Sequence, residues 1–229
     1  MLDFNKLISQ HLARESRPKQ VGRYYPSEIG SCLRKVWYSY TQPKETEMDL
    51  IKVFEVGNIL HDFMAEVMRS EKVKGEVQLL ASELPFQIQG KDFTISGRVD
   101  DLLLLVASGT KLLVEVKSTK SLAYTTGPAP QHLMQLQLYM HALQVTDGGL
   151  LYIQKDNLQS KFFPVKYDEA VAKIALDRFH TLHHALSSKS IPEPEARASR
   201  KSEIGWMCKN CEWREDCFRE TPDSKLEKK

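Results

Sequence analysis

The hydrophobic residues of this chain follow a helical period in three stretches. From about residue 51 to 70, apolar side chains recur three and four positions apart, which predicts an amphipathic helix. These side chains are Val53, Val56, Ile59, Leu60, Phe63 and Val67. The stretches from about 129 to 146 and from about 168 to 188 predict two further helices.

Between about residues 76 and 118 the pattern changes to short runs rich in β-forming residues. The runs are EVQLLA, LPFQI, FTIS, VDDLLLLV and KLLVEVKS, separated by Gly90 and by residues 108–110. This spacing predicts antiparallel strands joined as hairpins. Two later runs, LLYIQK and KFFPVKY, predict strands between the second and third helices, so we expect a mixed α/β fold.

The two ends of the chain differ from this central region. We expect residues 1–50 to form a basic, helical segment in which Ser27 caps the helix that carries Cys32. Pro192 and Pro194 cannot extend the third helix. The predicted organisation is an N-terminal helical segment at 1–50, a core at 51–190, and a small cysteine-bearing unit with a tail at 191–229.

Composition narrows the class of protein. The 229 residues are 41% hydrophobic and 27% charged, as in ordinary globular proteins, and suffice for one main core. The net charge of +2 neither requires nor excludes a polyanionic partner. No apolar run approaches the roughly 20 residues of a membrane helix, and the first residues lack the apolar centre of a signal peptide. We therefore expect a cytoplasmic protein without a membrane partner.

Charged residues on two neighbouring strands point to phosphodiester chemistry. Because side chains alternate along a strand, Glu115 and Lys117 share one face. A hairpin through residues 108–110 would bring Asp100 close to Glu115. Hydrolysis of a phosphodiester needs hard oxygen ligands for Mg²⁺ or Mn²⁺ and positive charge near the phosphate. Asp100, Glu115 and the Val116 carbonyl supply such ligands, and Lys117 supplies the charge.

Two alternatives apply to these strand residues. Glu-x-Lys on an exposed strand face is more often a solvated pair than a catalytic one. Asp101 must point away from Asp100 if the strand is regular, but a bulge would exchange the two. The choice of Asp100 rests on its place in Gly97-x-x-Asp100.

Three side chains on predicted helices could join this centre. An imidazole ligand at His61 would favour Mn²⁺ over Mg²⁺ because nitrogen is the softer donor, although a partly buried histidine is the commoner reading. Gln135 and Tyr139 are four residues apart and share a helix face, from which an amide and a phenol could position a nucleotide or a water molecule. The alternative for this pair is a polar stripe beside the core.

The four cysteines suggest a second site. Cys208, Cys211 and Cys217 lie close together, and Cys32 is the only other cysteine. Disulfides are rare in a reducing cytoplasm, and the polar neighbours of the three argue against plain burial. Four thiolates suit either tetrahedral zinc or an iron–sulfur cluster, and the spacing alone does not decide. Either group would tie the two ends of the chain together.

Taken in order, these elements resemble the RecB-like nucleases that contain an iron–sulfur cluster. The matching motifs are Cys32, Gly57-x-x-x-His61, Gly97-x-x-Asp100, Glu115-x-Lys117, Gln135-x-x-x-Tyr139 and Cys208-x2-Cys211-x5-Cys217. The chain looks most like the CRISPR-associated exonuclease family of the Cas-four type, and the likeness covers roughly residues 25–220. Val99 stands where the PD-(D/E)xK class has proline, which weakens the generic motif but not the ordered set.

The resemblance implies a restriction-endonuclease-like PD-(D/E)xK core, a mixed sheet flanked by helices, with an iron–sulfur subdomain that joins the N- and C-terminal segments. The implied roles are His61, Asp100 and Glu115 as ligands of Mn²⁺ or Mg²⁺, Lys117 as the catalytic lysine, Gln135 and Tyr139 as supports, and the four cysteines as ligands of a 4Fe-4S cluster. The implied activity is cleavage of single-stranded DNA from the 5′ end, on fragments that become CRISPR spacers, alongside the integrase subunits.

The sequence leaves three other functions open. A stand-alone DNA repair or phage recombination nuclease would use the same site. A non-catalytic DNA-binding scaffold could hold single strands through basic and aromatic residues such as Arg34 and Trp37. A zinc-stabilised interaction domain would make the Glu-x-Lys pair incidental.

Overall fold

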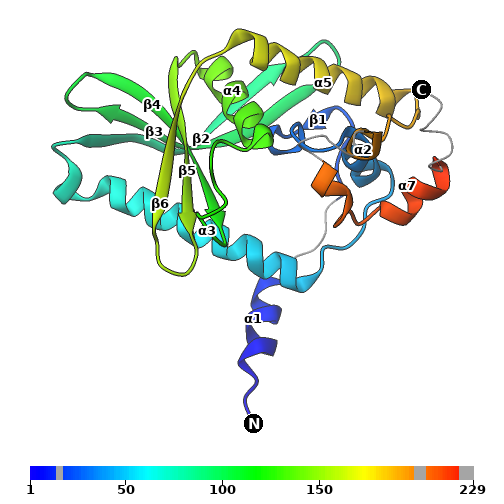
Figure 1. Cartoon of the computed structure of the whole chain (residues 1–229), viewed down its shortest axis with the longest axis horizontal. Coiled ribbons are helices and arrows are strands. Elements are labelled where there is room, and N and C mark those ends of the chain that lie inside the picture. Colours follow the sequence, from blue (N-terminus) through cyan, green and yellow to red (C-terminus); the bar gives the residue numbers. More distant parts are fainter. Residues whose placement is uncertain (14–17, 199–204, 222–229) are drawn as a thin grey trace.

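The computed structural model describes residues 1–13, 18–198 and 205–221, with a six-stranded mixed sheet at its centre (Figure 1). The strands are β1 (Arg23–Tyr24), β2 (Val77–Gln89), β3 (Thr94–Leu105), β4 (Thr110–Thr119), β5 (Asp147–Gln154) and β6 (Ser160–Lys166). The longer helices are α1 (Phe4–Leu12), α2 (Leu33–Thr41), α3 (Met48–Arg69), α4 (Pro130–Leu143) and α5 (Glu169–Ser187). The shorter ones are η1 (Pro26–Glu28), η2 (Glu71–Val73), α6 (Glu195–Ala198), η3 (Gly205–Cys208) and α7 (Arg214–Glu220).

Strand β3 organises the sheet because three other strands pair with it. Antiparallel β2 pairs along one edge of β3 from end to end. On the other edge, β1 pairs with Thr94 and Ile95 in parallel, and β4 pairs with residues 101–105 in antiparallel orientation. Residues 96–100 of β3 therefore lie between the ends of β1 and β4 on that edge. Beyond β4 the sheet continues with parallel β5 and antiparallel β6.

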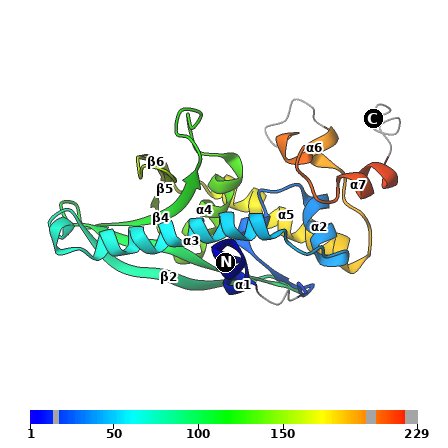
Figure 2. The same ribbon diagram turned by 90° about the horizontal axis from the view of Figure 1, so that it is seen from below.

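Helices cover both faces of this sheet, as the two views show (Figures 1 and 2). Against one face lies α3, where Leu60 packs with Val114 and Val116. The opposite face is covered by α4, whose Leu136 packs with Leu113 of the same strand β4. The alternation of β4 side chains thus places a helix on each side, and the predicted mixed sheet flanked by helices is confirmed.

The five predicted β-rich runs form only three strands. EVQLLA and LPFQI belong to the single strand β2, and FTIS and VDDLLLLV belong to β3. Pairing continues on both sides of the breaks between the runs, through Ser82 and Leu84 in β2 and through Gly97 and Arg98 in β3, with one shift of register between Leu79 and Ala81. Gly90 and residues 108–110 lie at the two hairpin connections, where the sequence placed them.

The prediction that the first fifty residues are helical is wrong around β1. Burial alternates there, with Tyr24 and Pro26 buried and Arg23 and Tyr25 exposed, which is the period of an extended chain. Ser27 does not cap the helix that follows Cys32, because it lies inside η1. Cys32 itself is the residue that precedes α2, and its side chain makes no capping hydrogen bond.

The C-terminal residues pack against the N-terminal helix α2. Glu195 of α6 accepts a hydrogen bond from the Leu33 N–H at 2.9 Å, and Lys44 forms an ion pair with Asp216 of α7 at 2.9 Å. The region around α2 and the C-terminal helices therefore meet beside the sheet, at the right of Figure 1, while the N-terminus lies at the bottom of that view. Among the helices of the described residues, none combines the length and the apolar character needed to cross a bilayer.

Candidate active site

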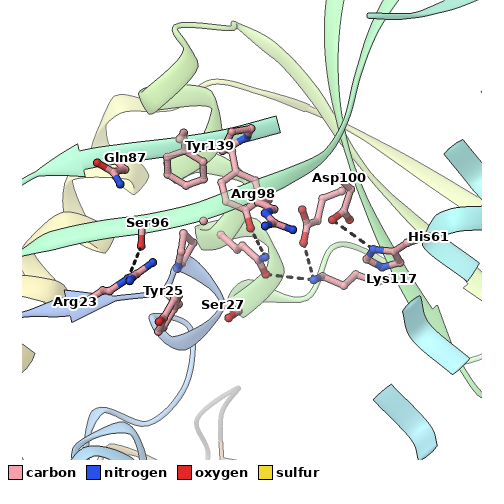
Figure 3. Close-up of a pocket in the computed structure, with 16 residues that line it drawn as sticks. Arg23, Tyr25, Ser27, His61, Gln87, Ser96, Arg98, Asp100, Lys117 and Tyr139 are labelled. Carbon is pink, nitrogen blue, oxygen red and sulfur yellow. Dashed lines mark hydrogen bonds and ion pairs between the residues drawn. The ribbon is translucent and has the colours of Figure 1, made fainter. Parts of the chain in front are cut away.

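A cavity of about 820 Å³ opens where β3 lies between the ends of β1 and β4. Its lining includes His61 from α3, Asp100 from β3, Glu115 and Lys117 from β4, and Gln135 and Tyr139 from α4. The structure thus brings together, in one cavity, the side chains that the sequence proposed from four separate elements (Figure 3). Asp101, the alternative to Asp100, is 2% exposed and does not line the cavity.

The Asp100 side chain of β3 forms a hydrogen bond to β4 just beyond the point where the backbone pairing of the two strands ends. The last paired residues are Asp101 and Val114. One position further on, the Asp100 carboxylate accepts a hydrogen bond from the Val116 N–H at 2.7 Å. In an extended strand the N–H and C=O of one residue point to the same edge, so the Val116 carbonyl also points toward this gap. The other carboxylate oxygen of Asp100 lies 3.4 Å from the His61 Nδ1.

A chain of hydrogen bonds runs from β4 to helix α4. Lys117 Nζ donates to Glu115 Oε1 at 2.6 Å and to Gln135 Oε1 at 3.2 Å. Gln135 Nε2 in turn donates to the Tyr139 hydroxyl oxygen at 2.6 Å. The hydroxyl hydrogen of Tyr139 is therefore available to a second partner. The i,i+4 spacing of Gln135 and Tyr139 is what places this pair on one face of α4.

The charges in the cavity shift one another's protonation equilibria. Glu115 is 1% exposed, and burial together with the Asp100 carboxylate raises the pKa of Glu115 to about 7. Burial opposes charge on Lys117, but the Glu115 carboxylate outweighs burial and raises the pKa of Lys117. Burial likewise opposes charge on His61, while the hydrogen bond that His61 donates to the Asp100 carboxylate raises the pKa of His61 above its ordinary value. The Asp100 and Glu115 carboxylates therefore favour the protonated forms of His61 and Lys117.

Glu83 of β2 is a further acidic residue at this site that the sequence analysis missed. One carboxylate oxygen of Glu83, one of Asp100 and one ring nitrogen of His61 all lie within 4.8 Å of one another. The β2–β3 register explains the approach, because Ser82 pairs with Asp101 and Leu84 pairs with Val99, which leaves Glu83 opposite Asp100. No local pattern in β2 singles out Glu83; only the long-range register reveals it.

The donor set fits a divalent cation. Carboxylate and carbonyl oxygens suit Mg²⁺ and Mn²⁺, and the imidazole adds a nitrogen donor that Mn²⁺ accepts more readily. Glu115 Oε2 is buried and has no hydrogen-bond partner among the described residues. A buried carboxylate oxygen of this kind is costly unless a cation or donor satisfies it. His61, Glu83 and Asp100 are the residues whose ligating atoms lie close enough together to share an ion, and Glu115, with its unpartnered oxygen, is the carboxylate beside them.

The four cysteines gather around a second, small cavity at the junction of the chain ends. Cys32 and Cys217 are buried, and Cys208 and Cys211 are partly exposed. Two buried arginines point toward one sulfur: Arg34 Nη1 lies 3.7 Å and Arg197 Nη1 lies 3.5 Å from Cys217 Sγ. Burial raises the pKa of the Cys208 and Cys211 thiols. All four cysteines thus line one small cavity between α2 and the C-terminal helices.

The mixed sheet flanked by helices, with acidic residues and a lysine gathered in one cavity, agrees with a nuclease core. The family model described as the PD-(D/E)XK nuclease superfamily matches residues 26–218 of the chain. The chain therefore belongs to the PD-(D/E)XK nuclease superfamily, and its activity is of the nuclease type. Among curated protein sequences, none matches significantly.

Solved structures share this architecture. The crystal structure of SSO0001 is similar with a TM-score of 0.59 and 21% sequence identity, over 96% of this chain and 94% of that one, which supports the fold. A phage-related exonuclease from Haemophilus somnus 129PT matches with a TM-score of 0.46 and 12% identity, over 69% and 81% of the two chains. The alkaline exonuclease LHK-Exo from Laribacter hongkongensis matches with a TM-score of 0.41 and 12% identity, over 74% and 90%.

Proposed function

We propose that this protein is a metal-dependent DNA exonuclease that acts on single-stranded DNA in the 5′-to-3′ direction. The observation that carries the proposal is the convergence of Asp100, Glu115 and Lys117 in one open cavity of a PD-(D/E)XK fold. The preference for single strands and the polarity come from the resemblance to the RecB-like iron–sulfur nucleases. The same resemblance places the activity in the trimming of DNA fragments before their capture as CRISPR spacers, beside the integrase subunits.

In this proposal Asp100, Glu115, His61 and the Val116 carbonyl hold Mn²⁺ or Mg²⁺, with Glu83 as an additional ligand. When bound, such an ion would supply Lewis acidity toward the phosphate and would activate water for hydrolysis. Nitrogen at His61 makes Mn²⁺ the preferred ion. The Val116 N–H holds Asp100 in place through the 2.7 Å hydrogen bond.

Lys117 acts on the reacting phosphate in this account. Its ammonium group is held by Glu115 and Gln135, so its position is fixed before substrate binds. A fixed positive charge stabilises the negative charge that develops on the phosphate oxygens during hydrolysis. Gln135 positions Lys117, and Tyr139 positions Gln135 through the 2.6 Å hydrogen bond. Gln135 and Tyr139 therefore contribute to orientation, and Lys117 is the one of the three that acts on the phosphate.

We also propose that Cys32, Cys208, Cys211 and Cys217 hold a 4Fe-4S cluster. In a tetrahedral zinc site with Zn–S bonds of about 2.3 Å, the sulfurs would lie about 3.8 Å apart. Among the described residues, which include all four cysteines, the only trio of ligating atoms within 4.8 Å of one another is that of His61, Glu83 and Asp100. The choice of the cluster over zinc comes from the resemblance to the RecB-like iron–sulfur nucleases, and the four cysteines that would hold it line one small cavity.

The charges around the cysteines agree with this cofactor. Buried charged groups are ordinarily paired, and Arg34, which is 5% exposed, makes no ion pair with a described carboxylate. Four thiolates around a cluster would carry the negative charge that balances Arg34. The cluster would then link α2 to α7 and hold the two ends of the chain together.

The proposal is tested with DNA labelled at either the 5′ or the 3′ end. Single-stranded and duplex substrates are incubated with the anaerobically purified protein and Mn²⁺, Mg²⁺ or EDTA. Early release of short products carrying the 5′ label, from single strands and only with metal, supports the proposal. Internal fragments would instead indicate an endonuclease, and DNA binding without cleavage would indicate a scaffold. For the CRISPR role, the expected result is trimming of spacer precursors to integrable length when integrase subunits are added.

A further inference from the structure

Arg23, Tyr25 and Ser27 form a row of side chains along the far part of the catalytic cavity. All three are exposed, whereas the residues at 24, 26 and 28 between them are buried. This alternation leaves one face of the segment open. The three side chains line the same cavity as Asp100 and Glu115, and Figure 3 shows them on the side away from His61.

The segment that carries the row runs alongside β3 toward the catalytic residues. Arg23 pairs with Thr94 at the start of β3. Three residues later Pro26 lies against Gly97, where a Cβ atom would come within 3.0 Å of the proline Cδ. Because the two strands are parallel, the segment approaches Asp100 as the chain proceeds.

The row therefore leads away from the catalytic residues. Ser27 lies nearest the catalytic lysine, Tyr25 follows, and Arg23 lies furthest away, as Figure 3 shows. Alternate residues of an extended chain are about 6.6 Å apart, from a rise of about 3.3 Å per residue. An aromatic ring and a guanidinium group thus follow one another along a line that leads out of the active site.

Buried contacts hold the row in place. Glu28 accepts hydrogen bonds from the Tyr25 N–H at 3.2 Å and from the Tyr40 hydroxyl at 2.9 Å. The Tyr24 hydroxyl lies 2.8 Å from His183 Nδ1 of α5. A binding surface fixed in this way loses little conformational freedom when a ligand binds.

Arg23 differs from the other cations that line the cavity. Lys117 is paired with Glu115, and Arg98 lies 3.5 Å from Glu83. Among the described residues, the Arg23 side chain donates only to the Ser96 hydroxyl, at 3.4 Å, and it forms no ion pair with a carboxylate of that part of the chain. Its charge is therefore available to an anionic ligand, and guanidinium groups bind phosphate well.

We propose that Tyr25 and Arg23 form a binding track for one flank of the DNA strand next to the scissile phosphate. Tyr25 stacks on a base, and Arg23 binds a backbone phosphate further from the metal centre. The proposal rests on the proposed nuclease function and adds the residues that orient the strand. Because stacking and phosphate binding do not depend on sequence, the track accepts any base.

The test measures binding of a fluorescent oligodeoxythymidylate by anisotropy in the Lys117→Ala background, with Mn²⁺ present. We expect Tyr25→Ala to raise the Kd by about tenfold, in the range of single stacking interactions, while Tyr25→Phe keeps the ring and binds nearly as the parent does. We expect Arg23→Ala to raise the Kd severalfold and to reduce the salt dependence of log K by about 0.7. Lys111→Ala, which removes an exposed charge at the far end of β4, is the matched control.

Two results would overturn the track. One is that Arg23→Ala and Tyr25→Ala bind as Lys111→Ala does, and the other is that Tyr25→Phe loses as much affinity as Tyr25→Ala. Cleavage by the protein with Lys117 intact is measured in parallel. If the protein with Lys117 intact cleaves DNA but the Arg23 and Tyr25 variants bind normally, only the proposed binding track is wrong. If it neither binds nor cleaves DNA, the proposed nuclease function fails as well.

Discussion

The Asp100 carboxylate accepts a hydrogen bond from the Val116 N–H at 2.7 Å, in the place where a backbone carbonyl of β3 would sit if the two strands stayed paired. One oxygen of Asp100 thus bonds the backbone between Glu115 and Lys117, and the other faces His61. The same carboxylate holds the two strands together and faces the metal site. Substitutions at Asp100 can therefore test its contact between the strands and its metal binding separately.

We predict that Asp100→Asn lowers the affinity for Mn²⁺ by more than about tenfold, the loss seen when groups that only support ligands are removed. The asparagine oxygen can still accept from the Val116 N–H, so the melting temperature should change little. Calorimetric titration with Mn²⁺ and thermal unfolding measure the two effects. Asp101→Asn, at the adjacent buried position, is the matched control and should keep both metal affinity and cleavage. Equal loss in both variants would contradict the choice of Asp100.

The raised pKa of Glu115 predicts how metal binding depends on pH. Protons and the metal ion compete for this carboxylate, which titrates at about pH 7 in the metal-free protein. Competition from one proton at Glu115 lowers the apparent affinity for Mn²⁺ by about tenfold when the pH falls from 8 to 6. The raised pKa of His61 acts in the same direction. An affinity that stays constant over this range would show that Glu115 is not a ligand.

The raised pKa of Glu115 also makes the stability of the metal-free protein depend on pH. A carboxyl group whose pKa is higher in the folded than in the unfolded state binds its proton more tightly when folded. The metal-free protein should therefore lose stability as the pH rises from about 5 toward 7, and Mn²⁺ should restore it above pH 7. Thermal unfolding with EDTA and with Mn²⁺ across this range measures both parts. A metal-free protein whose stability rises over this interval would contradict the burial of an unsatisfied Glu115.

Glu83 offers a test of the residue that the sequence analysis missed. Its φ of 52° lies in the left-handed region, which asparagine tolerates better than most residues. Glu83→Asn should therefore preserve the fold while removing a charged donor near His61 and Asp100. We expect a smaller loss of Mn²⁺ affinity than in Asp100→Asn, measured in the same titration. An unchanged affinity would restrict the ligands to those proposed from the sequence.

The cysteine site predicts a coloured protein. Anaerobic purification should give a brown protein with visible absorbance and about four iron atoms per chain, as a 4Fe-4S cluster requires. Cys211→Ser should lose the colour and lower the melting temperature by at least about 5 °C, because removal of a cross-link across a long loop costs about 2–4 kcal/mol. A colourless protein with one bound zinc would contradict the cluster, since Zn²⁺ does not absorb visible light.

Much of the fold and the candidate site followed from local patterns. Alternation along β4 placed Glu115 and Lys117 on one face, and the i,i+4 spacing placed Gln135 and Tyr139 on another. These relationships need no knowledge of distant partners. The structure brings the two pairs together through the Lys117–Gln135 hydrogen bond.

The features that were missed depend on partners far away in the sequence. Glu83 reaches the site only through the register of β2 on β3. The short strand β1 forms because Arg23 and Tyr24 pair with residues about seventy positions later, and its length is too small to leave a periodic signal. The row formed by Arg23 and Tyr25 follows from that pairing.

The central claim is that Asp100, Glu115 and Lys117 form the catalytic centre of a metal-dependent nuclease. Its most direct test compares Mn²⁺-dependent cleavage of end-labelled single-stranded DNA by the unmodified protein and by Lys117→Ala, at equal iron content and equal Mn²⁺ affinity. The account predicts that cleavage falls by about 100- to 1000-fold when Lys117 is removed, while DNA binding persists. Equal cleavage by the two proteins would contradict it.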